Sequence, residues 1–176
     1  GADFSKVAKA YPSPDFIEIS ENLLRMKVNL KTGHKTGFFL DQRENRLTLS
    51  QYCHGKEVLD CFCYTGGFAI SAMLAGAKSA SAIDLDEKAL ETARENARLN
   101  SANVTFQHVN AFDHLRMMIS KGMQADIVIL DPAKLAGCTE EISRAHRTYG
   151  DINKLGMQVV SPGGILLTCS CSGLIS

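Results

Sequence analysis

Two cysteines near the end of the sequence are the first residues that could do chemistry. Cys169 and Cys171 stand in TCSCSG, a hydroxyl-rich segment after an apolar run. A thiol in that setting can be a nucleophile, a metal ligand, half of a disulfide or a small buried hydrophobe. The first residues lack the apolar core of an export signal, so the thiols are expected to be reduced. The same holds for the other cysteines, Cys53, Cys61, Cys63 and Cys138.

A glycine turn and a carboxylate form a second candidate site. Gly66 and Gly67 separate the strand-like run EVLDCF from the helix-like run FAISAMLAGA, so the main chain there can approach a ligand closely. Asp84 ends the next apolar run, where a carboxylate can accept both hydroxyls of a ribose. Because the fuller G-x-G-x-x-G pattern is missing, an adenosine is favoured over a dinucleotide. The alternative is an ordinary tight turn with a solvated aspartate.

Two more polar positions follow strand-like runs. Asn110 comes after VTFQHV, and its amide can bond an adenine edge or simply form a turn. Asp131 and Pro132 come after the apolar run ADIVIL, which makes Asp131 a fixed acceptor at the rim of a sheet or a cap of the next helix.

The segments that must position these residues alternate in type from residue 57 onward. Strand-like runs (EVLDCF, SASAID, VTFQHV, ADIVILD, GGILLTCS) alternate with amphipathic helix-like runs, the last of which has a weak point at Gly150. This pattern predicts an α/β fold with a parallel, doubly wound sheet covered on both faces. Before it, residues 16–42 read as a β-hairpin and a third strand, TGFFLDQ, and residues 43–53 as a short helix. We therefore divide the chain into an irregular lead (1–15), a connecting β-element (16–54) and a Rossmann-like domain (55–176).

Composition excludes several classes of protein. Lys plus Arg equals Asp plus Glu at 19 each, so the chain lacks the basic excess of a module that grips nucleic acid by its phosphates alone. No apolar stretch approaches the roughly 18 residues that span a bilayer, so no membrane association is expected. The two C-x-C pairs do not match the C-x2-4-C spacing of structural zinc, and a strand should separate them, so no metal is predicted.

Taken together, these motifs resemble the class I S-adenosylmethionine-dependent methyltransferases, and more narrowly the bacterial large-subunit rRNA cytosine-C5 methyltransferase I family. The segments that carry the resemblance are GHKTGFFLDQRENR (33–46), VLDCFCYTGGFAISA (58–72), DPAK (131–134), YGDIN (149–153) and GGILLTCSCSG (163–173). The chain departs from the family at Ala133, where a second proline is usual, and at Asn110, where aspartate is usual. The first departure concerns the rigidity of the loop, the second the adenine contact.

The resemblance implies a cofactor, S-adenosylmethionine, and a set of site residues. Cys171 would be the nucleophile that adds to cytosine C6, with Asp131 hydrogen-bonding the ring. Phe39 or Tyr64 would stack on adenine or on the target base. The full cofactor-binding set is Asp60, Phe62, Tyr64, Thr65, Gly66, Gly67, Asp84, Leu85, Asn110, Ala111, Asp131, Phe39 and Arg43. Substrate-binding residues would be Lys35, Pro132 and Lys134.

The resemblance also bears on what accompanies the chain. Members of the family carry an RNA-binding PUA domain before this region and a final strand pair after it, so we expect a piece of a longer, cytoplasmic protein. Its partner would be large-subunit rRNA, and a homodimer is compatible with the sequence. Two alternatives stay open: a methyltransferase acting on a guanine nitrogen or a non-RNA substrate without covalent catalysis, and a cofactor- or rRNA-binding module without turnover.

Overall fold

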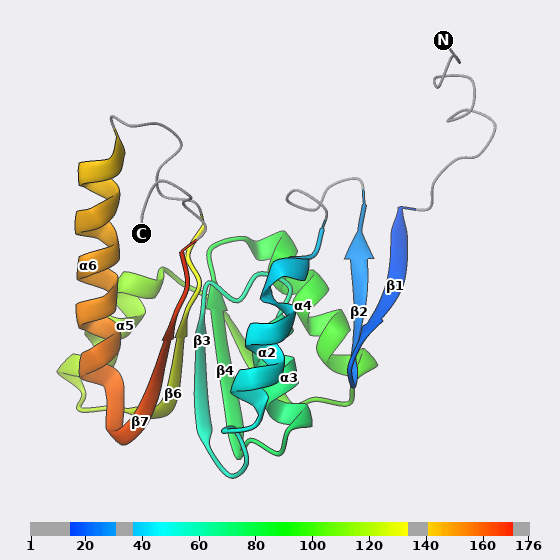
Figure 1. Cartoon of the computed structure of the whole chain (residues 1–176), viewed down its shortest axis with the longest axis horizontal. Helices are drawn as coiled ribbons and strands as arrows, with labels where there is room; N and C mark the ends of the chain where they lie inside the picture. The colour runs from blue at the N-terminus through cyan, green and yellow to red at the C-terminus, as the bar shows by residue number, and fades with distance from the viewer. Residues whose placement is uncertain (1–14, 31–36, 134–140, 171–176) are drawn as a thin grey trace.

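A parallel five-stranded sheet organises the chain. The computed structural model describes residues 15–30, 37–133 and 141–170 (Figure 1). The strands lie in the order β5-β4-β3-β6-β7, and every neighbouring pair is parallel. Their bounds are β3 (Glu57–Cys61), β4 (Ser79–Asp84), β5 (Val104–His108), β6 (Ala125–Leu130) and β7 (Val160–Thr168). The predicted sheet is thus confirmed, and β6 separates β3 from β7 as expected.

Helices cover both faces of this sheet. Helices α2, α3 and α4 lie on one side and α5 and α6 on the other (Figure 1). Their bounds are α2 (Arg43–Ser50), α3 (Gly67–Leu74), α4 (Glu87–Leu99), α5 (Ala111–Ser120) and α6 (Ile142–Val159). Helix α6 runs without a break through Gly150, because packing of its apolar face outweighs the low helix propensity of one glycine.

Strand β6 shows why the sheet is buried on both faces. Ile127 and Ile129 pack in the core beneath α2 and α3, whereas Val128 and Leu130 pack in the core beneath α5 and α6. Successive side chains of a strand point to opposite faces, so an uninterrupted apolar run fits a strand between two helix layers.

A separate two-stranded antiparallel hairpin precedes the sheet domain. It consists of β1 (Phe16–Glu21) and β2 (Leu24–Asn29), and the apolar side of β2 packs on α3 and α4. Two asparagines hold the free edge of β2: Asn96 on α4 accepts the Lys27 amide with its Oδ1 at 2.7 Å, and Asn100, the C-cap of α4, accepts the Arg25 amide with its Oδ1 at 2.9 Å. Residues i and i+4 share one face of a helix, so the pair replaces part of a neighbouring strand.

The predicted third strand, TGFFLDQ, is wrong. The described part of this segment forms a 3-10 turn, η1 (Leu40–Gln42), that leads directly into α2. The strands of both sheets in the described ranges come from elsewhere, so none of them pairs with residues 37–42.

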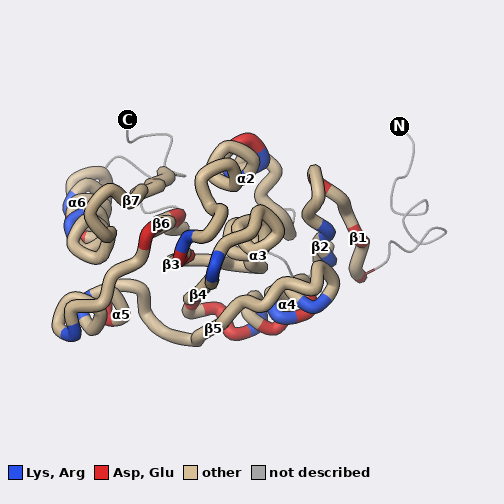
Figure 2. Tube along the Cα trace, turned by 90° about the horizontal axis from the view of Figure 1, so that it is seen from below, with Lys and Arg blue, Asp and Glu red and all other residues tan. Residues whose placement is uncertain are grey.

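Charge is distributed without a dominant sign. Figure 2 shows acidic and basic positions interspersed along the trace, with both present on α4. Within the described residues, no helix is both long and apolar enough to cross a bilayer.

The contact between α6 and the sheet generates a stability prediction. A Cβ atom at Gly156 would lie 2.8 Å from Leu130 Cδ1 and 3.1 Å from Leu166 Cδ1, whereas one at Gly150 would meet nothing within 4 Å. Gly156→Ala should therefore lower the free energy of unfolding by about 1–3 kcal/mol relative to Gly150→Ala, because only the first overpacks the core. Urea unfolding of both variants measures the difference. Equal stabilisation by the two alanines would contradict this packing.

Candidate functional site

A cavity of about 390 Å³ lies at the carboxyl ends of β3, β4 and β6. Strand β3 has β4 on one side and β6 on the other, so the strand order reverses at this point, where ligands bind in open α/β sheets. The cavity wall comes from the loop after β3, the start of α3, the ends of β4 and β6, and the segment before α2. Its members are Phe38, Phe39, Gln42, Arg46, Phe62, Cys63, Tyr64, Thr65, Gly67, Phe68, Asp84, Asp86, Asp131, Pro132 and Ala133.

The loop after β3 has an unusual backbone. Phe62 and Tyr64 adopt φ angles of +65° and +49°, and Gly66, the residue before α3, adopts +85°. Left-handed conformations of non-glycine residues are strained and persist only where the surroundings fix them. Here the Cys63 amide donates to the Ile83 carbonyl at 3.0 Å, which ties the loop to β4. The predicted glycine turn is therefore present, and it brings the start of α3 to the cavity.

Asp84 anchors the same loop from β4. Its Oδ2 accepts the Tyr64 amide at 2.8 Å and its Oδ1 accepts the Asp86 amide at 2.9 Å. The carboxylate is half-buried, borders the cavity and is held in one orientation by main-chain donors. Each oxygen can still accept a further hydrogen bond, as two ribose hydroxyls would require.

Asp60 lies buried behind the glycine turn. Its Oδ2 accepts the Ala69 amide at 3.1 Å, and among the described residues its Oδ1 has no hydrogen-bond partner. Burial raises the pKa of Asp60 well above its usual range, and the nearby charges of Asp131 and Asp84 raise it further. The raised pKa favours the protonated, neutral form of this buried side chain.

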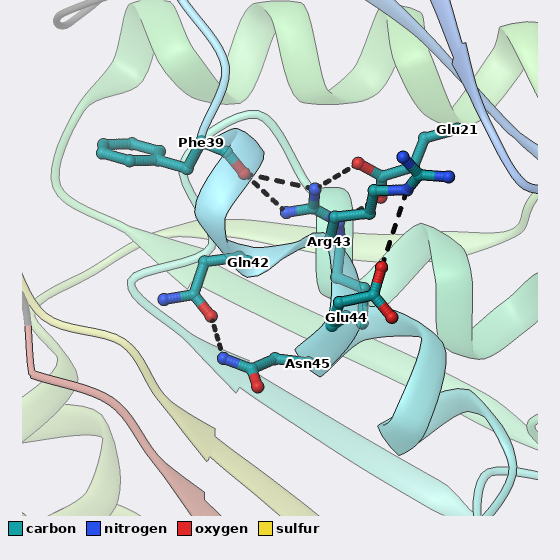
Figure 3. A network of polar contacts seen from close by, with 7 residues as sticks. Glu21, Phe39, Gln42, Arg43, Glu44 and Asn45 are labelled. Carbon is teal, nitrogen blue, oxygen red and sulfur yellow. Dashed lines mark hydrogen bonds and ion pairs between the residues drawn. The ribbon is translucent and has the colours of Figure 1, made fainter.

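Aromatic rings form another part of the wall. The Phe39 ring meets the Tyr64 ring edge-on, with centroids 5.4 Å apart and planes at 74°. The Phe39 carbonyl accepts hydrogen bonds from Arg46, whose guanidinium also pairs with Glu21 from the hairpin. Figure 3 shows Phe39 and Glu21 on opposite sides of this network. Pattern analysis of the sequence missed Arg46, and it also missed Phe38, Gln42, Cys63, Phe68 and Asp86. Only their proximity to GFFLDQ and to the glycine turn could have pointed to them.

The described cysteines differ in their surroundings. Burial raises the pKa of the Cys53 thiol to about 11, and it raises the pKa of Cys61 and Cys63 too, with added repulsion from Asp60. These thiols stay protonated near neutral pH, as expected of small buried hydrophobes. Cys169 follows β7: its amide donates to the Leu130 carbonyl at 2.8 Å, and its Sγ lies 3.7 Å from Gln42 Oε1.

Several predicted site residues lie apart from the cavity wall or outside the described residues. Asn110 caps α5, its Oδ1 accepting the Phe112 amide at 2.9 Å, so an adenine contact would fall to its amide nitrogen. Leu85 and Arg43 are exposed, and Ala111 is buried at the start of α5. Cys171, Lys35 and Lys134 lie outside the described residues, as does Cys138. Among the described residues, no three His, Cys, Asp or Glu side chains are grouped to hold a metal ion.

Comparison with known proteins gives concordant relatives. The chain is 46% identical over 165 residues to the ribosomal RNA large subunit methyltransferase I of Photobacterium profundum, which covers 92% of this chain and 42% of that protein. It is 46% identical over 162 residues to the protein of the same name from Aeromonas salmonicida, covering 90% and 41%. The chain thus spans about two fifths of the length of these relatives.

A solved structure agrees in fold. The crystal structure of SMU.776 complexed with SAH superposes with a TM-score of 0.79 at 27% identity, covering 90% of this chain and 42% of that one. Residues 10–176 match the family described as S-adenosylmethionine-dependent methyltransferase. The chain therefore belongs to the S-adenosylmethionine-dependent methyltransferases.

Proposed function

We propose that the chain is the cofactor-binding and catalytic part of an enzyme that methylates C5 of cytosine in large-subunit rRNA, through a covalent adduct with Cys171. The observation that carries the proposal is the cavity at the end of β3, bordered by Asp131 and by Asp84, whose carboxylate is held by main-chain donors. Relatives at 46% identity are named ribosomal RNA large subunit methyltransferase I, which supports rRNA as the substrate.

The described residues fit S-adenosylmethionine. Of the charged side chains that line the cavity, Asp84, Asp86 and Asp131 are acidic, and the one cation among those described, Arg46, is paired with Glu21. This excess of negative charge on the cavity wall favours a ligand with a sulfonium and an ammonium group. Asp84 would hold the ribose hydroxyls, and Asp60, which is buried and does not line the cavity, would act on the cofactor from behind the glycine turn. When bound, the cofactor supplies an electrophilic methyl group.

The rings and the loop main chain would then complete cofactor binding. Phe39, Phe62 and Tyr64 present aromatic surface for the adenine or for the target base. Thr65, Gly66 and Gly67 bring the main chain and the start of α3 close to the ligand. Four further residues do not line the cavity, and we propose that they contact the cofactor only at its periphery: Leu85, Asn110, Ala111 and Arg43.

Cytosine C5 is a weak nucleophile, and the chain's own residues would have to activate it. In the proposed reaction the Cys171 thiolate forms a bond to C6, and electron density moves to C5 while Asp131 supports protonation of the ring. C5 then takes the methyl group. A base removes the C5 proton, the bond between sulfur and C6 breaks, and the ring regains its double bond.

Two observations support this assignment of the acceptor side. Asp131 lies at the cavity from the end of β6, followed by buried Pro132, which we propose as a substrate contact with Lys35 and Lys134. Strand β7 ends at Thr168, and Cys169 next to it approaches Gln42 on the cavity wall. The segment that leads to Cys171 thus begins beside the cavity.

The proposal extends to partners and location. The target base would be extruded from its stack to reach the methyl group, and recognition of the rRNA would need an additional RNA-binding domain of PUA type. We propose a cytoplasmic enzyme, compatible with a homodimer, whose domains divide at residues 15 and 54 as the sequence indicates.

Loss of the Asp84 carboxylate should weaken cofactor binding. In Asp84→Asn the side-chain NH2 group takes the place of one carboxylate oxygen and faces a main-chain N–H. The loop after β3 therefore loses a hydrogen-bond acceptor, and the ribose site loses its negative charge. The dissociation constant for S-adenosylhomocysteine should rise about tenfold or more. Isothermal titration calorimetry measures it, with Asp113→Asn on the exposed face of α5 as matched control. Affinities of the two variants within twofold of each other would count against the assigned site.

The covalent step predicts a trapped adduct. RNA containing 5-fluorocytidine should form a stable complex with a full-length form of the protein, because fluorine at C5 cannot leave as the proton does. Cys171→Ala should abolish both this complex and methyl transfer, whereas Cys138→Ala should retain both. Denaturing gel electrophoresis and mass spectrometry of the RNA report the outcome. Full methylation by Cys171→Ala would instead indicate a guanine nitrogen or another acceptor that needs no thiol.

A further inference from the structure

A buried ion pair joins the hairpin to helix α2. Glu21 at the end of β1 and Arg46 in α2 are 7% and 4% exposed. Arg46 Nε donates to Glu21 Oε1 and Arg46 Nη2 to Glu21 Oε2, both at 2.7 Å. Burying two charges carries a large desolvation cost, so such a pair is weak grounds for stability by itself. The other hydrogen bonds of the guanidinium indicate a different role for the pair.

The same guanidinium holds the main chain of the cavity wall. Arg46 Nη1 and Nη2 both donate to the Phe39 carbonyl at 3.2 Å. In Figure 3 the Phe39 ring points away from Glu21. The Arg46 carbon Cζ lies 4.5 Å from the centre of the Phe38 ring and 5.9 Å from that of Phe68. These hydrogen bonds and the neighbouring aromatic rings together restrain the orientation of the Arg46 guanidinium.

Contacts continue from Phe39 across the cavity. The Phe39 ring meets Tyr64 edge-on at 5.4 Å, and the Tyr64 amide donates to Asp84. A continuous series of contacts therefore runs from Glu21 through Arg46 and Phe39 to the loop that presents Asp84. Phe39, Tyr64 and Asp84 border the cavity themselves.

We infer that Arg46 is a positioning residue for the cofactor: anchored by Glu21, it fixes the Phe39 main chain and so keeps the Phe39 ring against Tyr64. This inference rests on the proposed cofactor site. A lysine at position 46 could keep the ion pair with Glu21, but its single ammonium cannot grip the Phe39 carbonyl with two N–H groups while reaching Glu21 with two more. The wall would loosen although the charge is retained.

The test measures S-adenosylhomocysteine affinity and thermal unfolding of the same chain. Arg46→Lys should weaken binding about tenfold. Arg25→Lys is the matched control, because Arg25 forms a similar pair with Glu18 on the exposed side of the hairpin, and it should change nothing. Unchanged affinity of a folded Arg46→Lys variant would overturn the inference alone. A wild-type chain that fails to bind would overturn the cofactor site as well.

A double-mutant cycle separates positioning from general loss of structure. Phe39→Ala should itself weaken binding about tenfold, and adding Arg46→Lys to it should cost less than a further twofold, because Arg46 acts through Phe39. Two effects that multiply would show that Arg46 does not act through this ring. The cycle compares the effect of Arg46→Lys on affinity with and without the Phe39 ring. Any loss of stability caused by Arg46→Lys is present in both comparisons, so the difference between them still reports whether Arg46 acts through Phe39.

Discussion

The site depends on three carboxylates that the sheet brings close together. Asp60 lies next to the last residue of β3, Asp84 ends β4 and Asp131 follows β6, and parallel strands place their carboxyl ends at the same edge. Burial and the charges of the other two raise the pKa of Asp60, the Ala69 amide offsets part of this effect, and the amides of Tyr64 and Asp86 hold Asp84. The remaining negative potential is what a sulfonium cofactor can neutralise, so the chemistry of the ligand follows from the topology of the sheet.

The hairpin contributes to this arrangement from outside the sheet. An isolated two-stranded hairpin is marginally stable, and this one gains its support from α3 and α4. The hairpin in turn stabilises two segments that form the cavity wall. Buried Asn96 accepts the Lys27 amide of β2 and donates to the Thr65 carbonyl in the loop after β3, and Glu21 holds Arg46 beside Phe39. Two parts of the cavity wall are thereby tied to one small element.

The parts of this structure that were predictable depend on local pattern. The uninterrupted apolar run ADIVIL predicts a strand that is covered on both faces. Asp84 and Asp131 are predictable as site residues because each stands at the carboxyl end of such a strand. The glycine turn is local too. Its strained neighbours Phe62 and Tyr64 were not foreseen as left-handed, since only the hydrogen bonds from β4 fix them there.

Tertiary contacts explain what was missed. Glu21 and Arg46 are 25 positions apart, and each reads as an ordinary exposed charge within its own element. Their pairing appears only when the hairpin docks beside α2. Residues 37–42 failed as a strand for a related reason: a strand needs an edge to pair with, and the described strands of both sheets come from other segments.

The three carboxylates also impose a condition on any thiol nucleophile at this cavity. Cys63 illustrates it, because burial together with the charges of Asp60 and Asp84 raises the pKa of its thiol and keeps it protonated. A thiolate close to these groups is disfavoured by the same field, whereas a bound cation that offsets the carboxylates lowers the cost of forming it. Cofactor binding and thiolate formation would then favour one another by linkage. Under the proposed function, a bound cofactor would thus lower the cost of forming a nucleophilic thiolate at this cavity.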